Sequence, residues 1–164
     1  MNSYIQSLRE RDLIRVEMVC LGNICRSPMA AAVLANRAQE IDKPEIIVTS
    51  SGTSSWHVGE GAHQLSEKTW KLAGYKHSHT ARQFLVENFD EVDLILAMDE
   101  SNYANILQLA RHDHDREKVA MLRAFDQGVD SLEVPDPWGS EIDAYQEVLA
   151  MVEAAVSGLL KTLQ

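Results

Sequence analysis

The residues in this chain best suited to catalysis are a cysteine and an arginine six positions apart, Cys20 and Arg26, in the segment CLGNICRSP. A loop wrapped between residues at this spacing can turn successive backbone N–H groups inward around a tetrahedral oxyanion. Gly22 permits the backbone angles that so tight a loop needs. The same amides and the arginine would stabilise the thiolate of Cys20, which is the nucleophilic form of cysteine. The segment therefore predicts an oxyanion-binding loop that carries a thiolate nucleophile.

The segments on either side of this loop have the patterns of a strand and a helix. Residues 15–20 (RVEMVC) are predicted as a strand and residues 27–40 (SPMAAAVLANRAQE) as a helix, whose Pro28 suits the first turn. The N-terminus of that helix would point the positive end of its dipole at the loop. Cys20 has another reading, a buried thiol at a strand end, because free cysteine is among the most buried residue types. Strand, glycine and helix together favour the catalytic reading.

The remainder of the chain alternates short apolar runs with helical patterns. Apolar residues step by three and four along residues 142–163, which predicts a long amphipathic helix. Further strands are predicted at 46–50, 92–98 and 118–125, and further helices at 61–73 and 101–110. Four strands separated by helices imply an α/β fold, an open four-stranded parallel sheet with helices on both faces and the phosphate loop after the first strand. Ligands of such sheets bind beyond the carboxyl ends of the strands.

The length of 164 residues fits one domain with its own buried core. We expect residues 1–14 to be an N-terminal extension, either a tail or a short added helix, and residues 15–164 to be the domain. The sequence has no apolar run typical of a signal peptide or a membrane span, so the expected location is the cytoplasm. Acidic residues outnumber basic ones by 25 to 15, which argues against nucleic acid and anionic membranes as partners.

The chain has two cysteines, Cys20 and Cys25. They would stay reduced in the cytoplasm, and they are too few for a disulfide framework or a four-thiolate zinc site. No cluster of His, Cys and carboxylate residues has the spacing of metal ligands, so we expect no metal. Two readings of Cys25 stay open. It is either a small apolar loop residue or the partner that captures an oxidised Cys20 as a disulfide.

The segment VCLGNICRSPMA resembles the phosphate-loop signature of the low-molecular-weight protein tyrosine phosphatases. The similarity continues through SGTSSWHVG, LAGYKHSHTARQF, LILAMDESN and VPDP, and it covers about residues 15 to 160. The resemblance implies hydrolysis of phosphotyrosine through a phosphocysteine intermediate, with neither a metal nor an organic cofactor. It also implies tyrosine-phosphorylated proteins as partners, and phosphate or other oxyanions as ligands of the loop.

Matched residue by residue, the resemblance assigns three catalytic roles. The nucleophile of the family corresponds to Cys20, its phosphate-binding arginine to Arg26, and its general acid and base to Asp136 in VPDP. Without the resemblance, Asp136 would be read as a turn or capping residue before Pro137.

The resemblance also implies residues that shape the loop and line the substrate cleft. Asn23 matches the asparagine that braces the loop, Ser27 the hydroxyl that bonds the sulfur of the nucleophile, and His79 a histidine of the same network that supports without reacting. Trp56 corresponds to an aromatic wall of the cleft, although a buried indole is an equal alternative. The expected substrate-binding residues are Leu21, Gly22, Asn23, Ile24, Cys25, Ser27, Trp56 and Trp138.

Two positions bear on the substrate. Many family members follow the acid with two tyrosines, whereas here Trp138 and Gly139 come after the VPDP segment. Relatives that act on phosphoarginine typically have threonine where this chain has Ile24. The apolar Ile24 favours an aryl phosphate, because an aromatic ring needs an apolar neighbour.

Two alternative functions follow from the same loop. An arsenate reductase of the thioredoxin-coupled type needs further cysteines downstream, and none follows Cys25. A non-catalytic module that only binds phosphorylated partners would be favoured by loss of the nucleophile or the acid, but Cys20, Arg26 and Asp136 are all present. The sequence therefore favours an enzyme.

Overall fold

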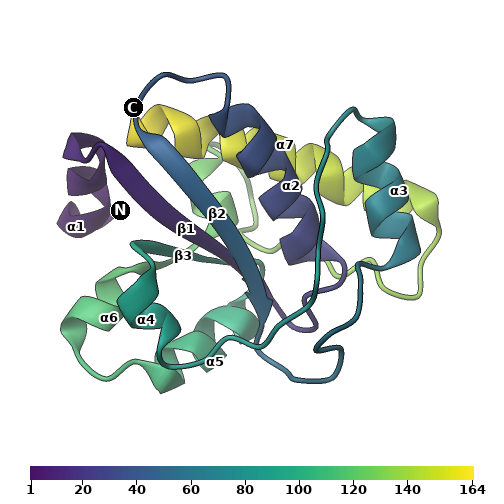
Figure 1. The fold of residues 1–164 in the computed structure, drawn as a ribbon, viewed down its shortest axis with the longest axis horizontal. Coiled ribbons are helices and arrows are strands. Elements are labelled where there is room, and N and C mark those ends of the chain that lie inside the picture. The colour runs from purple at the N-terminus through teal and green to yellow at the C-terminus, as the bar shows by residue number, and fades with distance from the viewer.

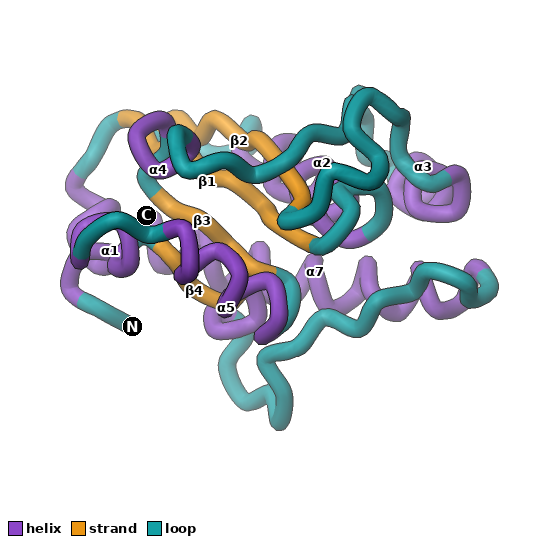
Figure 2. The backbone as a smooth tube through the Cα atoms, turned by 90° about the horizontal axis from the view of Figure 1, so that it is seen from below, coloured by secondary structure: helices purple, strands orange, loops and turns teal.

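The computed structural model describes residues 1–164. Its centre is one sheet of four parallel strands in the order β2-β1-β3-β4 (Figures 1 and 2). This arrangement confirms the predicted α/β class and the parallel sheet. The strands are β1 (Leu13–Cys20), β2 (Glu45–Gly52), β3 (Leu94–Ala97) and β4 (Val119–Met121).

Helices lie on both faces of the sheet (Figure 1). One face is covered by α2 and α7, with α3 packed against these two helices, and the other face is covered by α4, α5 and α6. Short helical segments α1 and η1 precede the first strand, and η2 follows the last one. The bounds are α1 Ser3–Ser7, η1 Leu8–Glu10, α2 Arg26–Ala38, α3 Gln64–Leu72, α4 Asn88–Glu91, α5 Glu100–Leu109, α6 Asp113–Glu117, η2 Leu122–Phe125 and α7 Ile142–Leu163.

The central strand β1 supplies both hydrophobic cores because its side chains alternate between the two faces. Val16 and Met18 belong to the larger core under α2 and α7, whereas Val19 belongs to the smaller core under α4 and α5. Every residue of β1 from Val16 to Cys20 is buried, as expected for a strand covered on both sides.

The register brings the end of β1 level with the end of β2, where Cys20 pairs with Gly52. The loop after Cys20 passes very close to this glycine. A Cβ atom at position 52 would lie 2.6 Å from the carbonyl oxygen of Leu21, so only glycine fits there. The loop is thereby placed at the carboxyl edge of the sheet.

The structure corrects the predicted strand at residues 118–125. Only Val119–Met121 pair with β3, and Leu122–Phe125 form the 3-10 turn η2. The apolar run therefore reflects burial rather than a longer strand, because Leu122 and Phe125 leave the sheet and join the core. The predicted helix at 61–73 begins later, at Gln64, where the side chain of His63 caps its first turn.

The N-terminal residues form the short helical segments α1 and η1, and β1 begins at Leu13, two residues before the predicted start of the domain. Ile5 and Leu8 are buried in the larger core. The short helices α4 and α6 lie outside every predicted element. No helix in the structure has both the length and the apolar character that crossing a membrane requires.

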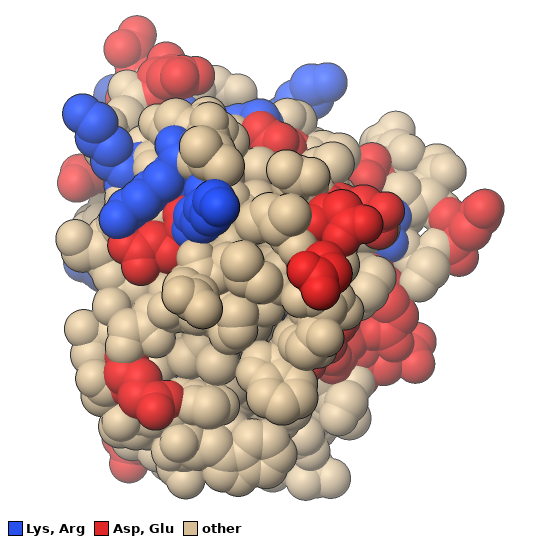
Figure 3. Space-filling model, turned by 90° about the vertical axis from the view of Figure 1, so that its right-hand side faces the viewer, with Lys and Arg blue, Asp and Glu red and all other residues tan.

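The chain has a net charge of −10, and its charged side chains are unevenly distributed over the surface. On the face shown in Figure 3, most basic side chains lie at the upper left with acidic ones among them, and further acidic side chains lie on the right and at the lower left. The area between them is largely uncharged. No broad basic surface covers this face, so attraction of an anion has to arise from local groups.

Helix α7 packs against η2 through Gly158. A Cβ atom at this position would lie only 1.8 Å from the carbonyl oxygen of Phe125. Alanine for glycine inside a helix usually stabilises a protein by about 0.5–1 kcal/mol. Here we expect Gly158→Ala to lower the free energy of unfolding by about 1–3 kcal/mol instead, because the added methyl group would overpack the contact between α7 and η2. Urea unfolding followed by circular dichroism measures the change.

The matched control is Ala150→Ser, on the exposed side of the same helix. It should change the free energy of unfolding by no more than about 0.5 kcal/mol. A stabilising effect of Gly158→Ala would contradict the packing described here.

Candidate active site

The loop from Cys20 to Arg26 turns its carbonyl oxygens away from its centre. The surrounding segments supply the donors, and each distance is between 2.6 and 2.9 Å. The pairs are Cys20 with the N–H of Thr53, Leu21 with the N–H and hydroxyl of Ser54, Asn23 with the ring of His79, Ile24 with the N–H of His63, and Cys25 with the hydroxyl of Ser66.

This outward bonding determines where the amide groups point. In a planar trans peptide the carbonyl of one residue and the N–H of the next point in opposite directions. The N–H groups of residues 21, 22, 24, 25 and 26 therefore face the hollow of the loop. A ring of inward N–H groups at the start of a helix is a binding site for a tetrahedral oxyanion.

Asn23 holds the loop from behind. Its φ of 56° places it in the left-handed region, which asparagine tolerates better than most residues. Its side-chain amide donates to the hydroxyls of Ser27 at 2.8 Å and Ser50 at 3.0 Å. Its side-chain oxygen accepts the N–H of Arg82 at 3.0 Å. The side chain of Asn23 is completely buried, so these bonds are not exchanged with water.

The sulfur of Cys20 lies at the base of the hollow. It is 3.0 Å from the hydroxyl oxygen of Ser27, and it accepts the N–H of Asn23 at 3.3 Å. Helix α2 begins at Arg26, so the positive end of its dipole faces the sulfur. The sulfur therefore lies among hydrogen-bond donors at the N-terminal end of a helix.

Arg26 is buried and tightly bonded. Its guanidinium donates to the carboxylate of Asp99 at 2.6 Å and to the carbonyl of Val134 at 3.0 Å. Burial disfavours its charged form, but the Cys20 thiolate and the carboxylates of Asp99 and Asp136 outweigh burial, so the pKa of Arg26 is raised. The guanidinium therefore keeps its positive charge beside the sulfur.

Asp136 comes from a distant loop that is attached to the sheet. The N–H of Val134 donates to the carbonyl of Met98 at 2.8 Å, just beyond β3. Asp136 itself accepts the N–H of Trp138 at 3.1 Å, and its other oxygen is 3.8 Å from the guanidinium of Arg26. The carboxylate is half exposed. It can therefore exchange protons with solvent while it faces the loop.

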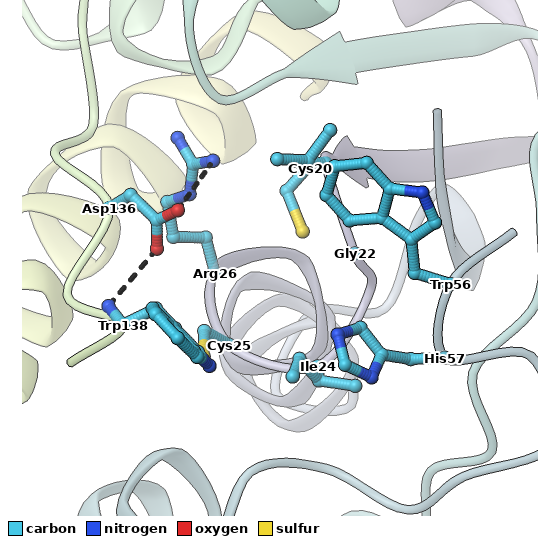
Figure 4. Close-up of a pocket in the computed structure, with 10 residues that line it drawn as sticks. Cys20, Gly22, Ile24, Cys25, Arg26, Trp56, His57, Asp136 and Trp138 are labelled. Atoms are coloured by element: carbon cyan, nitrogen blue, oxygen red, sulfur yellow. Dashed lines mark hydrogen bonds and ion pairs between the residues drawn. The ribbon is translucent and has the colours of Figure 1, made fainter. Parts of the chain in front are cut away.

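These residues enclose a cavity of about 270 Å³ (Figure 4). The sulfur of Cys20 lies in its floor, with Trp56 and His57 on one side and Asp136 and Trp138 on the other. Trp56 and Trp138 are 72% and 65% exposed, so Trp56 forms a wall at the cavity mouth and is not a buried indole. The cavity thus has an apolar rim above a polar floor.

The structure brings the predicted residues together. Nine of them line the cavity, namely Cys20, Leu21, Gly22, Ile24, Cys25, Arg26, Trp56, Asp136 and Trp138. Asn23, Ser27 and His79 lie behind the loop and bond to it. Burial lowers the pKa of His79, so its neutral ring donates a hydrogen bond to the carbonyl of Asn23 at 2.6 Å.

Several residues of the site were not predicted from the sequence. His57 lines the cavity next to Trp56 and pairs with Glu60. Asp99, which anchors Arg26, lies in the quoted segment LILAMDESN but was assigned no role. Nothing in the local sequence marks Ser50 or Arg82 as partners of Asn23. Nowhere in the structure are three or more His, Cys, Asp or Glu side chains arranged to hold a metal ion.

Cys25, like Cys20, is a free and buried thiol. Burial is the main reason that the pKa of Cys25 is raised to about 11, against a smaller opposite effect of its hydrogen bond to Tyr145. The two atoms, Sγ of Cys25 and the hydroxyl oxygen of Tyr145, are 3.5 Å apart. Cys25 is therefore protonated at neutral pH. The Cys20–Cys25 disulfide stays a prediction.

The protonated state of Cys25 predicts selective alkylation. With a pKa of about 11, only about one Cys25 thiol in ten thousand is ionised at pH 7, and the fraction grows as the pH approaches 11. Both cysteines line the cavity, so access alone does not distinguish them, and we expect iodoacetamide at pH 7 to label the predicted nucleophile Cys20 and to leave the protonated Cys25 unmodified. Peptide mass spectrometry measures both sites, and protein unfolded in urea is the control in which both are labelled. Rapid labelling of Cys25 in folded protein would contradict this assignment.

Comparison with known proteins agrees with the loop and its surroundings. Residues 15–164 match the family described as low molecular weight phosphotyrosine protein phosphatase. A low molecular weight protein-tyrosine-phosphatase of Streptomyces coelicolor is 41% identical over 92% of this chain and 93% of its own length.

Solved structures give the same result. A protein tyrosine phosphatase of Entamoeba histolytica, crystallised with Hepes in the active site, has a TM-score of 0.86 at 32% identity and covers 92% of this chain and 96% of its own. An arginine phosphatase of Geobacillus stearothermophilus has a TM-score of 0.79 at 30% identity and covers 92% and 93%. The loop, the sheet that positions it and these matches lead to one conclusion: the chain belongs to the low molecular weight phosphotyrosine protein phosphatase family.

Proposed function

We propose that this protein hydrolyses phosphotyrosine in proteins through a phosphocysteine intermediate on Cys20, with Arg26 binding the phosphoryl group and Asp136 acting as general acid and then general base. One observation carries the proposal. A thiol, a charged guanidinium and a half-exposed carboxylate face one cavity whose floor is a ring of inward N–H groups. These are the three groups that phosphoryl transfer to sulfur requires.

The first half-reaction breaks the ester. The loop amides and Arg26 hold the three equatorial oxygens of the phosphoryl group, which positions the phosphorus over the sulfur of Cys20. The sulfur attacks in line, the S–P bond forms and the P–O bond to the tyrosine breaks. Asp136, in its protonated form, gives its proton to the departing phenolic oxygen.

The second half-reaction releases phosphate. Asp136 is now a carboxylate and removes a proton from a water molecule, whose oxygen attacks the phosphorus. The S–P bond breaks and the electron pair returns to the sulfur. The hydroxyl of Ser27 and the N–H of Asn23, at 3.0 and 3.3 Å from the sulfur, stabilise the thiolate that leaves.

The supporting residues act through the loop. We assign Asn23, Ser27 and His79 the task of keeping the loop in its binding shape, because each is bonded to the loop from behind. Leu21, Gly22, Ile24 and Cys25 would contribute backbone N–H groups or apolar contacts to the substrate. The nucleophile has to stay reduced, which supports the cytoplasm as the location.

The rim of the cavity favours an aryl phosphate. Trp56, Trp138 and Ile24 offer apolar surface beside the phosphate position, where an aromatic ring can stack. Tyrosine-phosphorylated proteins are therefore the proposed partners. Phosphoarginine is the second candidate, because one similar solved structure is an arginine phosphatase.

Initial rates on matched peptides test the substrate. We expect phosphotyrosine to be hydrolysed faster than phosphoarginine and phosphoserine by a wide margin, because the ring fills the apolar rim and reaches the deep floor. The Cys20→Ser variant is the inactive control, since a serine hydroxyl is far less ionised than a thiol at neutral pH. Equal or faster hydrolysis of phosphoarginine would overturn the proposed substrate but leave the mechanism intact.

The role of Asp136 is tested by leaving groups of different acidity. Asp136→Asn should slow hydrolysis of phosphotyrosine by roughly 10²–10⁴-fold, the usual contribution of a general acid. The loss should shrink on an aryl phosphate whose phenol leaves without a proton. Steady-state rates on a series of substituted phenyl phosphates measure both effects. A loss that is uniform along the series would mean that Asp136 only orders its loop.

A further inference from the structure

Glu17 is a buried carboxylate with no part in the mechanism above. It lies on β1 three residues before Cys20, and its side chain has no exposed surface. Strand alternation directs it to the same face as Val19, away from α2 and α7. A charged group in such a place is costly unless it is paired and hydrogen-bonded. Its partners should therefore reveal what it does.

The carboxylate of Glu17 joins three other segments. One oxygen pairs with the guanidinium of Arg82 and accepts the hydroxyl of Thr49 at 3.1 Å. The other oxygen accepts the side-chain amide of Asn88 at 2.6 Å. Every donor points at this one carboxylate, from β2, from α4 and from the segment around Arg82.

Arg82 connects this carboxylate to the phosphate loop. Its Nε donates to the carbonyl of Ser50 at 3.1 Å, and its backbone N–H donates to the side-chain oxygen of Asn23 at 3.0 Å. Its own carbonyl accepts the N–H of Gly52 at 2.9 Å. The side chain of Arg82 is 40% exposed, so Glu17 and the Ser50 carbonyl are what keep it from turning into solvent.

We propose that Glu17 is a positioning residue for the phosphate loop. It fixes Arg82, Arg82 fixes the side chain of Asn23, and Asn23 keeps the left-handed conformation that places the N–H groups and the Ser27 hydroxyl around the sulfur. Removal of this carboxylate alone would leave Arg82, Thr49 and the side-chain amide of Asn88 without their common partner. Only a carboxylate can orient the guanidinium, because ion pairs of arginine are directional. This inference rests on the proposed function.

The test begins with Glu17→Gln. The new side chain has nearly the same shape, but it has no charge and turns a donor toward the amide of Asn88. We expect kcat for phosphotyrosine peptide and the affinity for inorganic phosphate each to fall about 10–100-fold, since a shift of about 1 Å in a positioned group has effects of this size. Calorimetric titration with inorganic phosphate measures the loop directly and needs no turnover.

A double variant, Glu17→Gln with Asn88→Asp, restores the hydrogen bonds. The new amide can then donate to a carboxylate at position 88, which can still accept the N–H of Leu85 as Asn88 does. The negative charge also returns to the neighbourhood of Arg82. We expect this double variant to recover most of the lost phosphate affinity and kcat.

The matched control is Glu153→Gln, which removes a carboxylate that pairs with Arg37 at 3.1 Å and accepts the hydroxyl of Tyr75 at 2.6 Å. Neither partner bonds the phosphate loop. This variant should lower the melting temperature and leave phosphate affinity and kcat unchanged. A purely structural Glu17 would behave in the same way.

If Glu17→Gln does not fold, Arg82→Lys is the substitute, because its side chain is partly exposed and keeps its charge but loses the fork of donors. The same losses are expected. A folded variant with the phosphate affinity and kcat of the wild type would overturn the inference. A wild type that neither binds phosphate nor turns over phosphotyrosine would instead overturn the proposed function.

Discussion

The phosphate site depends on one constraint: the N–H groups of the loop can face an anion only if the carbonyl oxygens of the same peptides find donors elsewhere. A buried carbonyl without a partner costs roughly 1–3 kcal/mol, so several of them would unfold the loop. Here the donors come from residues 53 and 54, the start of α3 and His79. Segments that never touch the substrate thus determine the shape of the site.

The charged groups of the site are likewise held in place by neighbouring residues. The chain carries a net charge of −10, yet the site is built to bind an anion. Arg26 is held by Asp99 and lies near Asp136, so its charge is balanced before any ligand arrives. An incoming phosphoryl group meets the inward amides and a fixed guanidinium, which need little rearrangement during the reaction. Glu17 and Arg82 extend this fixed arrangement to the opposite face of β1.

Much of the fold was predictable because its signals are local. The positions of β1, β2 and β3 and the long helix α7 follow from apolar runs and helical spacing, and the structure confirms them. The predicted strand at 118–125 was wrong beyond Met121, because an apolar run records burial whether the chain stays in the sheet or turns under α7. The short helices α4 and α6 have too few residues to show a period.

The sequence by itself determined the chemistry: the spacing of Cys20 and Arg26, the glycine between them and the flanking strand and helix identify an oxyanion loop, and the resemblance adds Asp136. Only the tertiary structure decided which residues support that chemistry. Asp99 and Arg82 are 73 and 59 residues from the loop residues that they bond. Contacts between segments so far apart in the sequence depend on how the strands align and the helices pack, and no local pattern records them.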